Sequence, residues 1–215
     1  MNKTDSLPPV IVVSGPDGVG KSTQIDKLTK KFDELNLKYN TVWLRHRHYL
    51  SLVVLLISRL TGHTVFDSHK EYQYQYHDFD NNLLGMAYIF TMYVDLLIAY
   101  VFRVWIPVVL GRTVICDRGP LDTLIDIHFK TEIEYQNTWL ELMYLLLIPM
   151  ENENIILNMD YADCVHRNER FKYERDFEER VNHYELESSR FNIEQIDASM
   201  NVEAVFNSMW AEITD

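Results

Sequence analysis

Short β-branched runs alternate with helical patterns along the chain. Runs of apolar residues predict five strands, and they resemble strands buried in a parallel sheet: 10–14, 39–44, 113–116, 155–159 and 191–196. Apolar positions at three- and four-residue steps predict helices at 21–35, 50–60, 121–129, 138–147 and 202–213, with another beginning at 177. Strands that alternate with helices indicate a parallel α/β sheet with right-handed crossovers. We expect a single domain over 1–215, with a five-stranded parallel sheet flanked by helices.

The segment 83–110 is unusually apolar. It is interrupted only by Asp95, Arg103 and Pro107, and its length alone is sufficient to span a bilayer. Two ionisable groups, a proline and its position between two well-patterned units instead favour a buried core or dimer-interface helix. We therefore expect no transmembrane span, although loose membrane association through this helix stays open.

Composition and charge narrow the class of protein. The chain has 215 residues, 47% of them hydrophobic, and a net charge of −12. This is enough apolar material for a core without disulfides, and the acidic surface disfavours a long nucleic acid as a partner. Cys116 and Cys164 lie far apart and outside any C-x-x-C spacing, which suits a reducing compartment. With no secretory pattern at the start, we expect a cytoplasmic protein.

The sharpest motif is GPDGVGKST at 15–23, which follows a predicted strand and opens a predicted helix. Its glycines let backbone N–H groups converge on phosphate oxygens, and the helix N-terminus adds a positive dipole. Lys21 could reach the β- and γ-phosphates, and Ser22 could ligate Mg²⁺. The alternative is an ordinary glycine turn before a helix. We predict an ATP site formed by Gly15, Asp17, Gly18, Val19, Gly20, Lys21, Ser22 and Thr23.

A second charged motif follows the predicted strand 113–116. Asp117 comes directly after the buried run and is placed to hold Mg²⁺ together with Ser22, while Arg118 is suited to a transferring or receiving phosphate. The alternative is a salt bridge at the strand end. No N-K-x-D motif for guanine occurs, so a GTPase is disfavoured.

These motifs together resemble the thymidylate kinase family of P-loop nucleoside-monophosphate kinases. The resemblance covers nearly the whole chain in order: GPDGVGKST, WLR ending at Arg45, VICDR at 114–118, the Arg-rich CVHRNERFKYER after NMD, and the C-terminal pattern from RVNHYELESSRF onward. It implies a P-loop kinase fold with a short Arg-rich lid at about 160–178. It also implies ATP and Mg²⁺ as cofactors, and a homodimer formed through the apolar helices.

The resemblance assigns roles to individual residues. It implies that Asp17 and Arg45 place the acceptor, with Arg118 on phosphate. Gly18 stands where some family members have an arginine, so the lid arginines are the expected source of transition-state charge. The alternative for this basic segment is a solvated loop. The expected catalytic residues are Lys21, Asp17, Arg118, Arg167 and Arg170, and Arg175 lies in the same lid.

Departures from the family pattern bear on the acceptor. The R-E-P-G-G that usually follows the second strand is replaced by RHRHYLS, and Asp95 lies near the usual position of an acceptor-contacting arginine. A carboxylate there would repel phosphate but could accept hydrogen bonds from a ribose or another hydroxyl. We therefore expect Arg45, Asp95 and Arg118 to bind the acceptor.

The expected activity is phosphoryl transfer from ATP to a nucleoside monophosphate, such as dTMP, or a related nucleotide. The first alternative is a kinase of a nucleoside or another small hydroxyl-bearing molecule. The second is an ATP-binding regulatory or assembly protein without turnover, which would use the apolar helices to engage a partner or membrane.

Two further groups of residues have open interpretations. Arg45, His46, Arg47 and His48 favour a phosphate-facing basic patch over a metal site, because no Cys or carboxylate cluster accompanies the histidines. The aromatic residues of 72–79 could stack on a base or pack a loop onto the core.

Overall fold

Five parallel strands form the central sheet of the computed structural model, which describes residues 7–45, 49–69, 72–77, 79, 82–131, 133–147 and 152–214. The side chains of 67–69, 72–76 and 82 lie outside this description. The strand order is β2-β5-β1-β6-β7, and all four pairings are parallel. The strands are β1 (Val10–Ser14), β2 (Tyr39–Trp43), β5 (Thr113–Asp117), β6 (Asn152–Asn158) and β7 (Glu194–Asp197). The predicted α/β class and five-stranded parallel sheet are confirmed.

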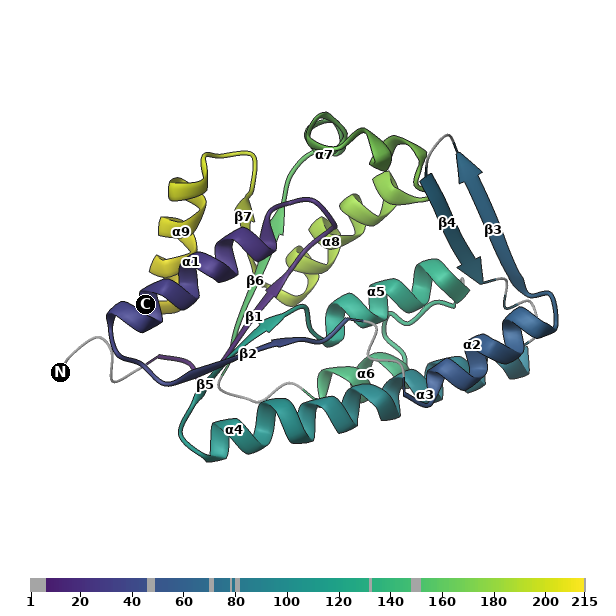
Figure 1. Ribbon diagram of the computed structural model, residues 1–215, viewed down its shortest axis with the longest axis horizontal. Coiled ribbons are helices and arrows are strands. Elements are labelled where there is room, and N and C mark those ends of the chain that lie inside the picture. The colour runs from purple at the N-terminus through teal and green to yellow at the C-terminus, as the bar shows by residue number, and fades with distance from the viewer. Residues whose placement is uncertain are drawn as a thin grey trace.

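Helices cover both faces of this sheet (Figure 1). The N-terminal and C-terminal helices α1 and α9 lie together on one face, whereas α2 to α6 lie on the other. The bounds are α1 (Lys21–Glu34), α2 (Ser51–Leu60), α3 (Asn82–Tyr100), α4 (Ile106–Val109), α5 (Pro120–Thr131), α6 (Trp139–Leu145), α7 (Tyr161–Arg167), α8 (Phe177–Phe191) and α9 (Val202–Thr214).

Alternation along β1 explains the two cores. Val10 and Val12 pack in the cluster shared with α2 to α6, whereas Ile11 and Val13 pack in the cluster shared with α1 and α9. All four are buried because neighbouring side chains of a strand point to opposite faces of the sheet, and both faces are covered here.

A β-hairpin lies apart from the main sheet. Strands β3 (Thr64–His69) and β4 (Tyr72–His77) pair antiparallel, whereas we expected packing of a loop or stacking on a base. The alternating YQYQYH has the period of two that is typical of a strand. Phe79, just after β4, is buried and stacks on His77 and Tyr88, so this aromatic belongs to the core.

The apolar segment 83–110 forms one long helical run. Helix α3 continues through a π-helical segment, Val101–Trp105, into α4. Leu83–Val109 is the one helical run in the described part of the chain that is long and apolar enough to cross a membrane, judged by length and composition alone. Its inner side, including Tyr100 and Val104, is fully buried in the core, while much of its outer side is exposed.

The topology places three loops at one edge of the sheet. The carboxyl ends of β2, β5 and β1 are neighbours, so the segments that follow these strands meet there. In open α/β sheets ligands bind at this edge, where successive connections leave in opposite directions. Here the connection after β1 leads to β2, and the connection after β5 leads the other way to β6. The motifs at 15–23, Arg45 and Asp117–Arg118 are brought together in this way.

Candidate functional site

The loop between β1 and α1 is shaped by its glycines. Gly15 has φ +137°, and a Cβ there would lie 2.1 Å from the carbonyl oxygen of Leu157, so only glycine fits. No side chain in the described part of the chain caps the start of α1. The first-turn N–H groups of this helix and its positive dipole end are therefore available to an anion.

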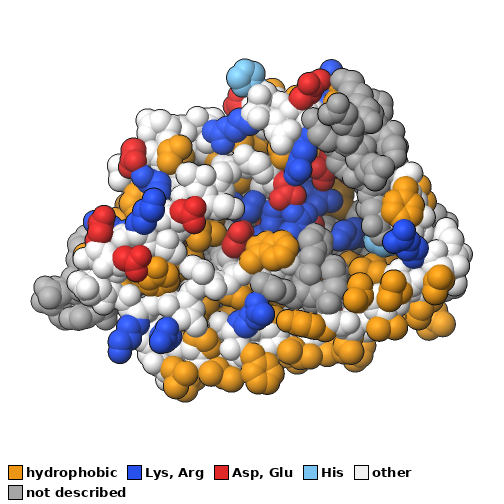
Figure 2. Space-filling model, viewed as in Figure 1, with side chains coloured by type: hydrophobic (Ala, Val, Ile, Leu, Met, Phe, Trp, Pro, Cys, Tyr) orange, Lys and Arg blue, Asp and Glu red, His pale blue; other side chains and the backbone are white. Residues whose placement is uncertain are grey.

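A cavity of about 310 Å³ opens beside this helix N-terminus. The space-filling view shows a hollow near the middle of the visible face, with Lys and Arg side chains gathered in it (Figure 2). The residues that line it are Asp17, Gly18, Gly20, Lys21, Ser22, Thr23, Trp43, Arg45, Asp117 and Arg118. Most of the site residues expected from the sequence thus meet at one place.

Lys21 is folded back onto its own loop. Its Nζ donates to the carbonyl oxygens of Gly15 at 2.8 Å and Pro16 at 2.6 Å, and the residue is only 7% exposed. Burial lowers the pKa of Lys21 to about 7, and the positive charge of Arg118 adds to this effect. An anion beside this ammonium would stabilise its charged form.

Arg118 is held in place by Asp122 on α5. Arg118 donates to the Asp122 carboxylate at 3.0 Å and to the carbonyl oxygen of Gly15 at 2.9 Å. Asp122 is itself fixed by donors from Ser14, Gly119 and Tyr184. The backbone of Arg118 has φ +73°, which is uncommon for a residue with a side chain. This environment keeps the guanidinium at the cavity wall.

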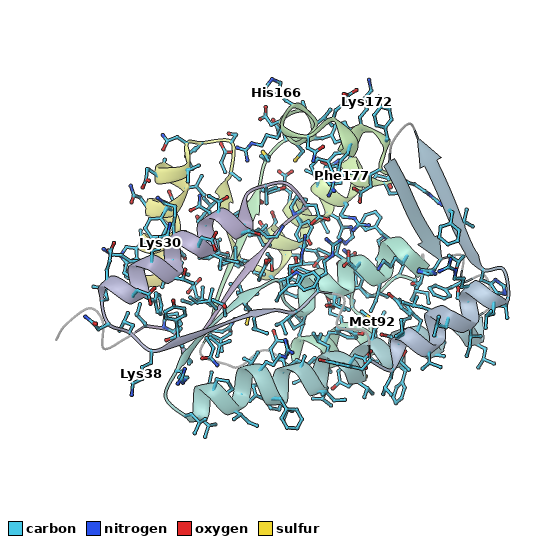
Figure 3. All side chains as sticks on the ribbon, in the orientation of Figure 1. Lys30, Lys38, Met92, His166, Lys172 and Phe177 are labelled. Atoms are coloured by element: carbon cyan, nitrogen blue, oxygen red, sulfur yellow. The ribbon has the colours of Figure 1, made fainter. Side chains whose placement is uncertain are left out.

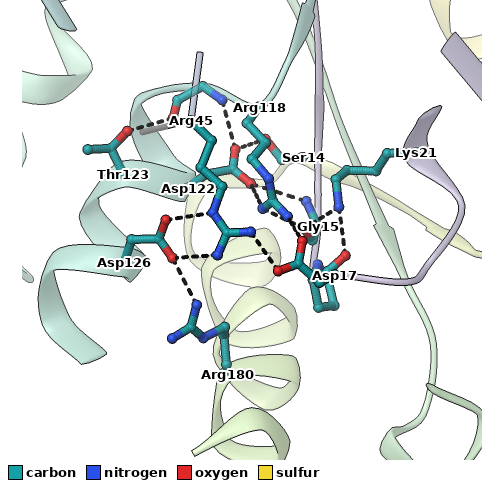
Figure 4. Close-up of polar contacts among 12 residues, drawn as sticks. Ser14, Gly15, Asp17, Lys21, Arg45, Arg118, Asp122, Thr123, Asp126 and Arg180 are labelled. Carbon is teal, nitrogen blue, oxygen red and sulfur yellow. Dashed lines mark hydrogen bonds and ion pairs between the residues drawn. The ribbon is translucent and has the colours of Figure 1, made fainter. Parts of the chain in front are cut away.

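Asp17 joins two arginines of the cavity (Figure 4). Its carboxylate accepts from Arg45 Nη1 at 2.6 Å and forms a second, short ion pair with Arg118. Burial would raise the pKa of the Asp17 carboxyl, but the positive charges of Arg118 and Arg45 outweigh burial and hold this pKa well below its usual range. Asp17 is therefore a very weak base, and its carboxylate holds the Arg45 and Arg118 guanidinium groups in position.

A second carboxylate supports Arg45 from behind. Asp126 accepts from Arg45 Nε at 3.0 Å and Nη2 at 3.2 Å, and Arg180 of α8 donates to it at 2.9 Å. Figure 4 shows Arg45 between Asp17 and Asp126, with Arg180 below Asp126 and joined to it. The fork-shaped contact fixes the plane of the Arg45 guanidinium.

Asp117 and Ser22 are the residues that fit a magnesium ion. Asp117 Oδ1 is buried and has no hydrogen-bond partner among the described residues, and burial raises the pKa of this carboxyl. The described residues contain no cluster of three or more His, Cys, Asp or Glu that could hold a metal without help. Mg²⁺ commonly binds through one or two protein oxygens, with water and substrate phosphates completing its shell, so this donor set fits a nucleotide-bound ion.

Asp95, which we expected at the acceptor, does not line this cavity. It is 1% exposed, and its oxygens accept from the backbone N–H groups of 49, 50 and 51 and from the Ser51 hydroxyl. The carboxylate satisfies the free N–H donors at the start of α2, as an N-cap does, but from a neighbouring helix. These contacts tie the start of α2 to α3.

The expected lid arginines do not line the cavity. In this segment α7 is followed by a 3₁₀ turn, Glu169–Tyr173, which leads to α8. Arg167 donates to the carbonyl oxygens of Val19 and Ala198, at 3.3 and 2.6 Å. Arg170 lies over the Phe171 ring, and Arg175 pairs with its neighbour Asp176. Among the contacts described for these three arginines, only those of Arg167 reach the β1–α1 loop, through Val19.

Several residues of the site were missed from the sequence. Asp122 and Asp126 are four residues apart on α5, and Arg180 and Tyr184 are four apart on α8. The two helices present these pairs to each other, so that Tyr184 donates to Asp122 and Arg180 to Asp126. The sequence does contain a signal for these residues, because polar side chains four residues apart lie on the same face of a helix. Trp43, at the end of β2, also lines the cavity and was not anticipated.

Residues 46–48 of the predicted basic patch at 45–48 lie outside the described residues, so the structure places only Arg45 of that patch.

No protein-family model matches the chain, and comparison with curated proteins gives no match.

Proposed function

We propose that this protein is a P-loop kinase that transfers the γ-phosphoryl group of Mg·ATP to a nucleoside monophosphate or a similar nucleotide, as the thymidylate kinase family does. One observation carries the proposal. A single cavity combines an uncapped helix N-terminus, a buried lysine, a carboxylate with an unsatisfied oxygen and two arginines. This is the set of groups that phosphoryl transfer requires, because its catalysis is mainly positioning and charge neutralisation.

The donor half of the cavity would bind the triphosphate. The first-turn N–H groups of α1 and the Lys21 ammonium would hold the β- and γ-phosphates, with Ser22 and Asp117 binding Mg²⁺ directly or through water. When bound, Mg²⁺ supplies neutralisation of the developing phosphate charge. Lys21 Nζ donates to the carbonyl oxygens of its own loop, and it would turn from them toward the phosphates.

The acceptor half would be served by Arg45 and Arg118. A phosphate oxygen of the acceptor forms a bond to the γ-phosphorus while the bond from that phosphorus to the β–γ bridging oxygen breaks, and ADP leaves with the electron pair. An ionised monophosphate has no proton to lose, so no strong base is needed. Asp17, whose carboxyl has a depressed pKa, suits the positioning of both arginines and not proton abstraction.

The position of Asp95 separates two acceptor classes. The nucleoside-kinase alternative had two grounds, the absence of R-E-P-G-G after the second strand and a carboxylate at 95 that could bind a hydroxyl. The second ground is weakened, because Asp95 accepts from the backbone at the start of α2. The charged groups that line the acceptor half include two arginines, which favour a phosphate-bearing acceptor.

ADP formation tests the proposal. The purified chain with Mg·ATP would be assayed in a coupled reaction against a panel of nucleoside monophosphates and the corresponding nucleosides. We expect ADP production that depends on at least one monophosphate. Lys21→Met should abolish it, whereas Lys30→Met, an exposed lysine on the same helix, should leave it unchanged. Nucleotide binding without acceptor-dependent ADP would instead support the regulatory alternative.

A further inference from the structure

Helices α5 and α8 are joined by two polar contacts that lie one helical turn apart. Tyr184 of α8 donates to Asp122 of α5 at 2.7 Å, and Arg180 of α8 donates to Asp126 of α5 at 2.9 Å. Because residues four apart lie on the same face of a helix, the two contacts follow one another along the line where the helices meet. None of these four residues is among the described residues that line the cavity.

The first contact holds the guanidinium of Arg118. Arg118 Nη1 donates to the Asp122 carboxylate at 3.0 Å and to the Tyr184 hydroxyl at 3.1 Å. The Tyr184 hydroxyl therefore accepts from the guanidinium and donates to the carboxylate that the guanidinium also contacts. Both Asp122 and Tyr184 are 1% exposed, so little solvent competes for these hydrogen bonds.

The second contact acts on Arg45 in the same way, through a shared carboxylate. Asp126 accepts from Nε and Nη2 of Arg45 and from Nη1 of Arg180. Figure 4 shows both arginines joined to Asp126. Arg180 thus takes up part of the negative charge that would otherwise act on Arg45 alone, which leaves more of the Arg45 positive charge for an anion in the cavity.

The two arginines of the cavity differ in their positions. Arg118 donates to the carbonyl oxygen of Gly15 at 2.9 Å, so it lies beside the loop that would hold the donor phosphates. In the contacts described for it, Arg45 meets that loop only at the Asp17 side chain and turns its other edge to Asp126. Arg118 therefore suits the phosphoryl group in transfer, and Arg45 suits the phosphate of the acceptor.

These positions predict different kinetic effects. A charge that acts on the transferring group contributes mainly in the transition state, so disturbing it lowers kcat. A charge that binds the acceptor phosphate equally before and during transfer contributes to KM instead.

We propose that Tyr184 and Arg180 are positioning residues for phosphoryl transfer, which act through the two arginines of the cavity and not by contact with a nucleotide. Tyr184 fixes Arg118 for the transferring phosphoryl group, and Arg180 keeps Arg45 available to the acceptor phosphate. This inference rests on the proposed function and adds two residues of α8 to it.

Steady-state kinetics of Tyr184→Phe and Arg180→Met test the proposal, with Mg·ATP and the monophosphate that gives the highest turnover in the panel above. Tyr184→Phe should lower kcat about tenfold and leave the acceptor KM unchanged, a smaller effect than the loss of about 10²–10³-fold when a donor to the transition state is removed. Arg180→Met should raise the acceptor KM about fivefold, the equivalent of one hydrogen bond, and leave kcat unchanged.

Tyr144→Phe is the matched control for Tyr184→Phe. Tyr144 is also fully buried in the same core cluster, and its hydroxyl donates to the carbonyl oxygen of Ile89, away from the cavity. Both variants lose one buried hydrogen bond and keep the ring, so both should lower the midpoint of urea unfolding. Only Tyr184→Phe should lower kcat.

Arg190→Met is the matched control for Arg180→Met. Arg190 also lies on α8, and it pairs with the buried carboxylates of Glu141 and Glu187. The two arginine side chains are 23% and 12% exposed, respectively, so the substitutions are comparable. Arg190→Met should lower stability and leave both kinetic constants at their wild-type values.

Inorganic phosphate tests the second contact without catalysis. Lys21→Met removes the lysine of the donor half, so phosphate binding in this background reports on the two arginines. Calorimetric titration should show a Kd about fivefold weaker when Arg180→Met is added and an unchanged Kd when Arg190→Met is added.

Two results would overturn the proposal. One is that Tyr184→Phe and Arg180→Met have the same kinetic constants as their controls, which would assign both residues to stability alone. The other applies to a wild type without acceptor-dependent ADP formation. That wild type would contradict the proposed function, and equal phosphate affinities of the Arg180→Met and Arg190→Met proteins would then also remove Arg180 from the site.

Discussion

Lys21 combines burial with a neighbouring positive charge, and both lower its proton affinity. The pKa of about 7 means that a large part of the ligand-free protein has a neutral Lys21 at pH 8. Phosphate oxygens beside Nζ would raise this pKa again. The residue that binds the nucleotide in our account is therefore also a proton acceptor on binding.

Proton uptake on nucleotide binding follows from this shift. At pH 8, Mg·ATP binding should take up a substantial fraction of one proton, and at pH 6 much less, because Lys21 is then already charged. Calorimetric titration in buffers of different ionisation enthalpy measures this number. Lys30→Met, whose lysine is exposed, should show the same uptake as the wild type. Uptake that does not change between the two pH values would contradict the role of Lys21.

The stability of the ligand-free chain should depend on the same group. Between the folded pKa of about 7 and the unfolded pKa of about 10.4, the folded chain binds fewer protons than the unfolded chain at this position. The free energy of unfolding therefore gains a contribution that rises with pH across that window. Urea unfolding at several pH values should show this slope in the wild type, and Lys21→Met should reduce it.

At the scale of elements, the 3₁₀ turn Glu169–Tyr173 packs directly on the β1–α1 loop. Gly18 has φ +87°, and a Cβ there would lie 2.4 Å from the Phe171 ring. Phe171 is buried and stacks on Phe177 at the start of α8 (Figure 3), with ring centroids 4.4 Å apart. The absence of a side chain at 18 is what allows the turn to approach the loop.

A double-mutant cycle tests this contact. Gly18→Ala should cost about 1–2 kcal/mol for the left-handed backbone and about 1–3 kcal/mol more for displacing the ring. Phe171→Leu removes the ring atoms that the new methyl group would meet, so Gly18→Ala should cost only the backbone part in that background. Gly20→Ala is the control, because it has φ +100° and open space around its Cβ. Equal costs of Gly18→Ala in both backgrounds by urea unfolding would rule out the contact.

Helix α2 depends on a carboxylate from α3. The buried Asp95 carboxylate accepts hydrogen bonds from three backbone N–H groups. Asparagine would remove its negative charge and place an amide NH₂ group, itself a donor, against one or more of these N–H groups. Asp95→Asn should lower the free energy of unfolding by about 2–4 kcal/mol. Glu185→Gln, at an exposed position on α8, should have little effect. The value of kcat/KM for the acceptor should be unchanged in both variants, and a selective fall in Asp95→Asn with wild-type stability would restore Asp95 to the acceptor site.

At the scale of the whole molecule, local patterns predicted the architecture well. Strands β1, β5 and β6 have strong β-branched or apolar signals, and the order of helices between the strands dictates a parallel sheet. The signal of β7 is weak, since EQID has one apolar residue, and the strand predicted at 191–196 begins too early because α8 continues to Phe191. The motifs at the ends of β1, β2 and β5 could be placed together because parallel strands align their carboxyl ends. The hairpin β3–β4 was missed although YQYQYH has the period of a strand, because its tyrosines also suit base stacking or the packing of a loop onto the core.

Long-range polar contacts could not be predicted in the same way. Asp126 meets Arg45 across 81 residues of sequence, and Tyr184 meets Asp122 across 62. Such pairs depend on how α5 and α8 pack against the sheet, which no local period encodes. The contacts of Asp95 were missed for the same reason, since only the packing of α3 beside α2 reveals the N–H groups that it binds.

The central claim is that the cavity transfers a phosphoryl group and does not merely bind or hydrolyse ATP. The most direct test follows the label from γ-phosphate-labelled ATP in the presence of Mg²⁺ and a nucleoside monophosphate such as dTMP. Our account predicts that the label appears in a nucleoside diphosphate, with one ADP formed for each labelled product, and that Lys21→Met abolishes it. Label that stays in ATP, or appears only as inorganic phosphate whichever monophosphate is supplied, would contradict the account.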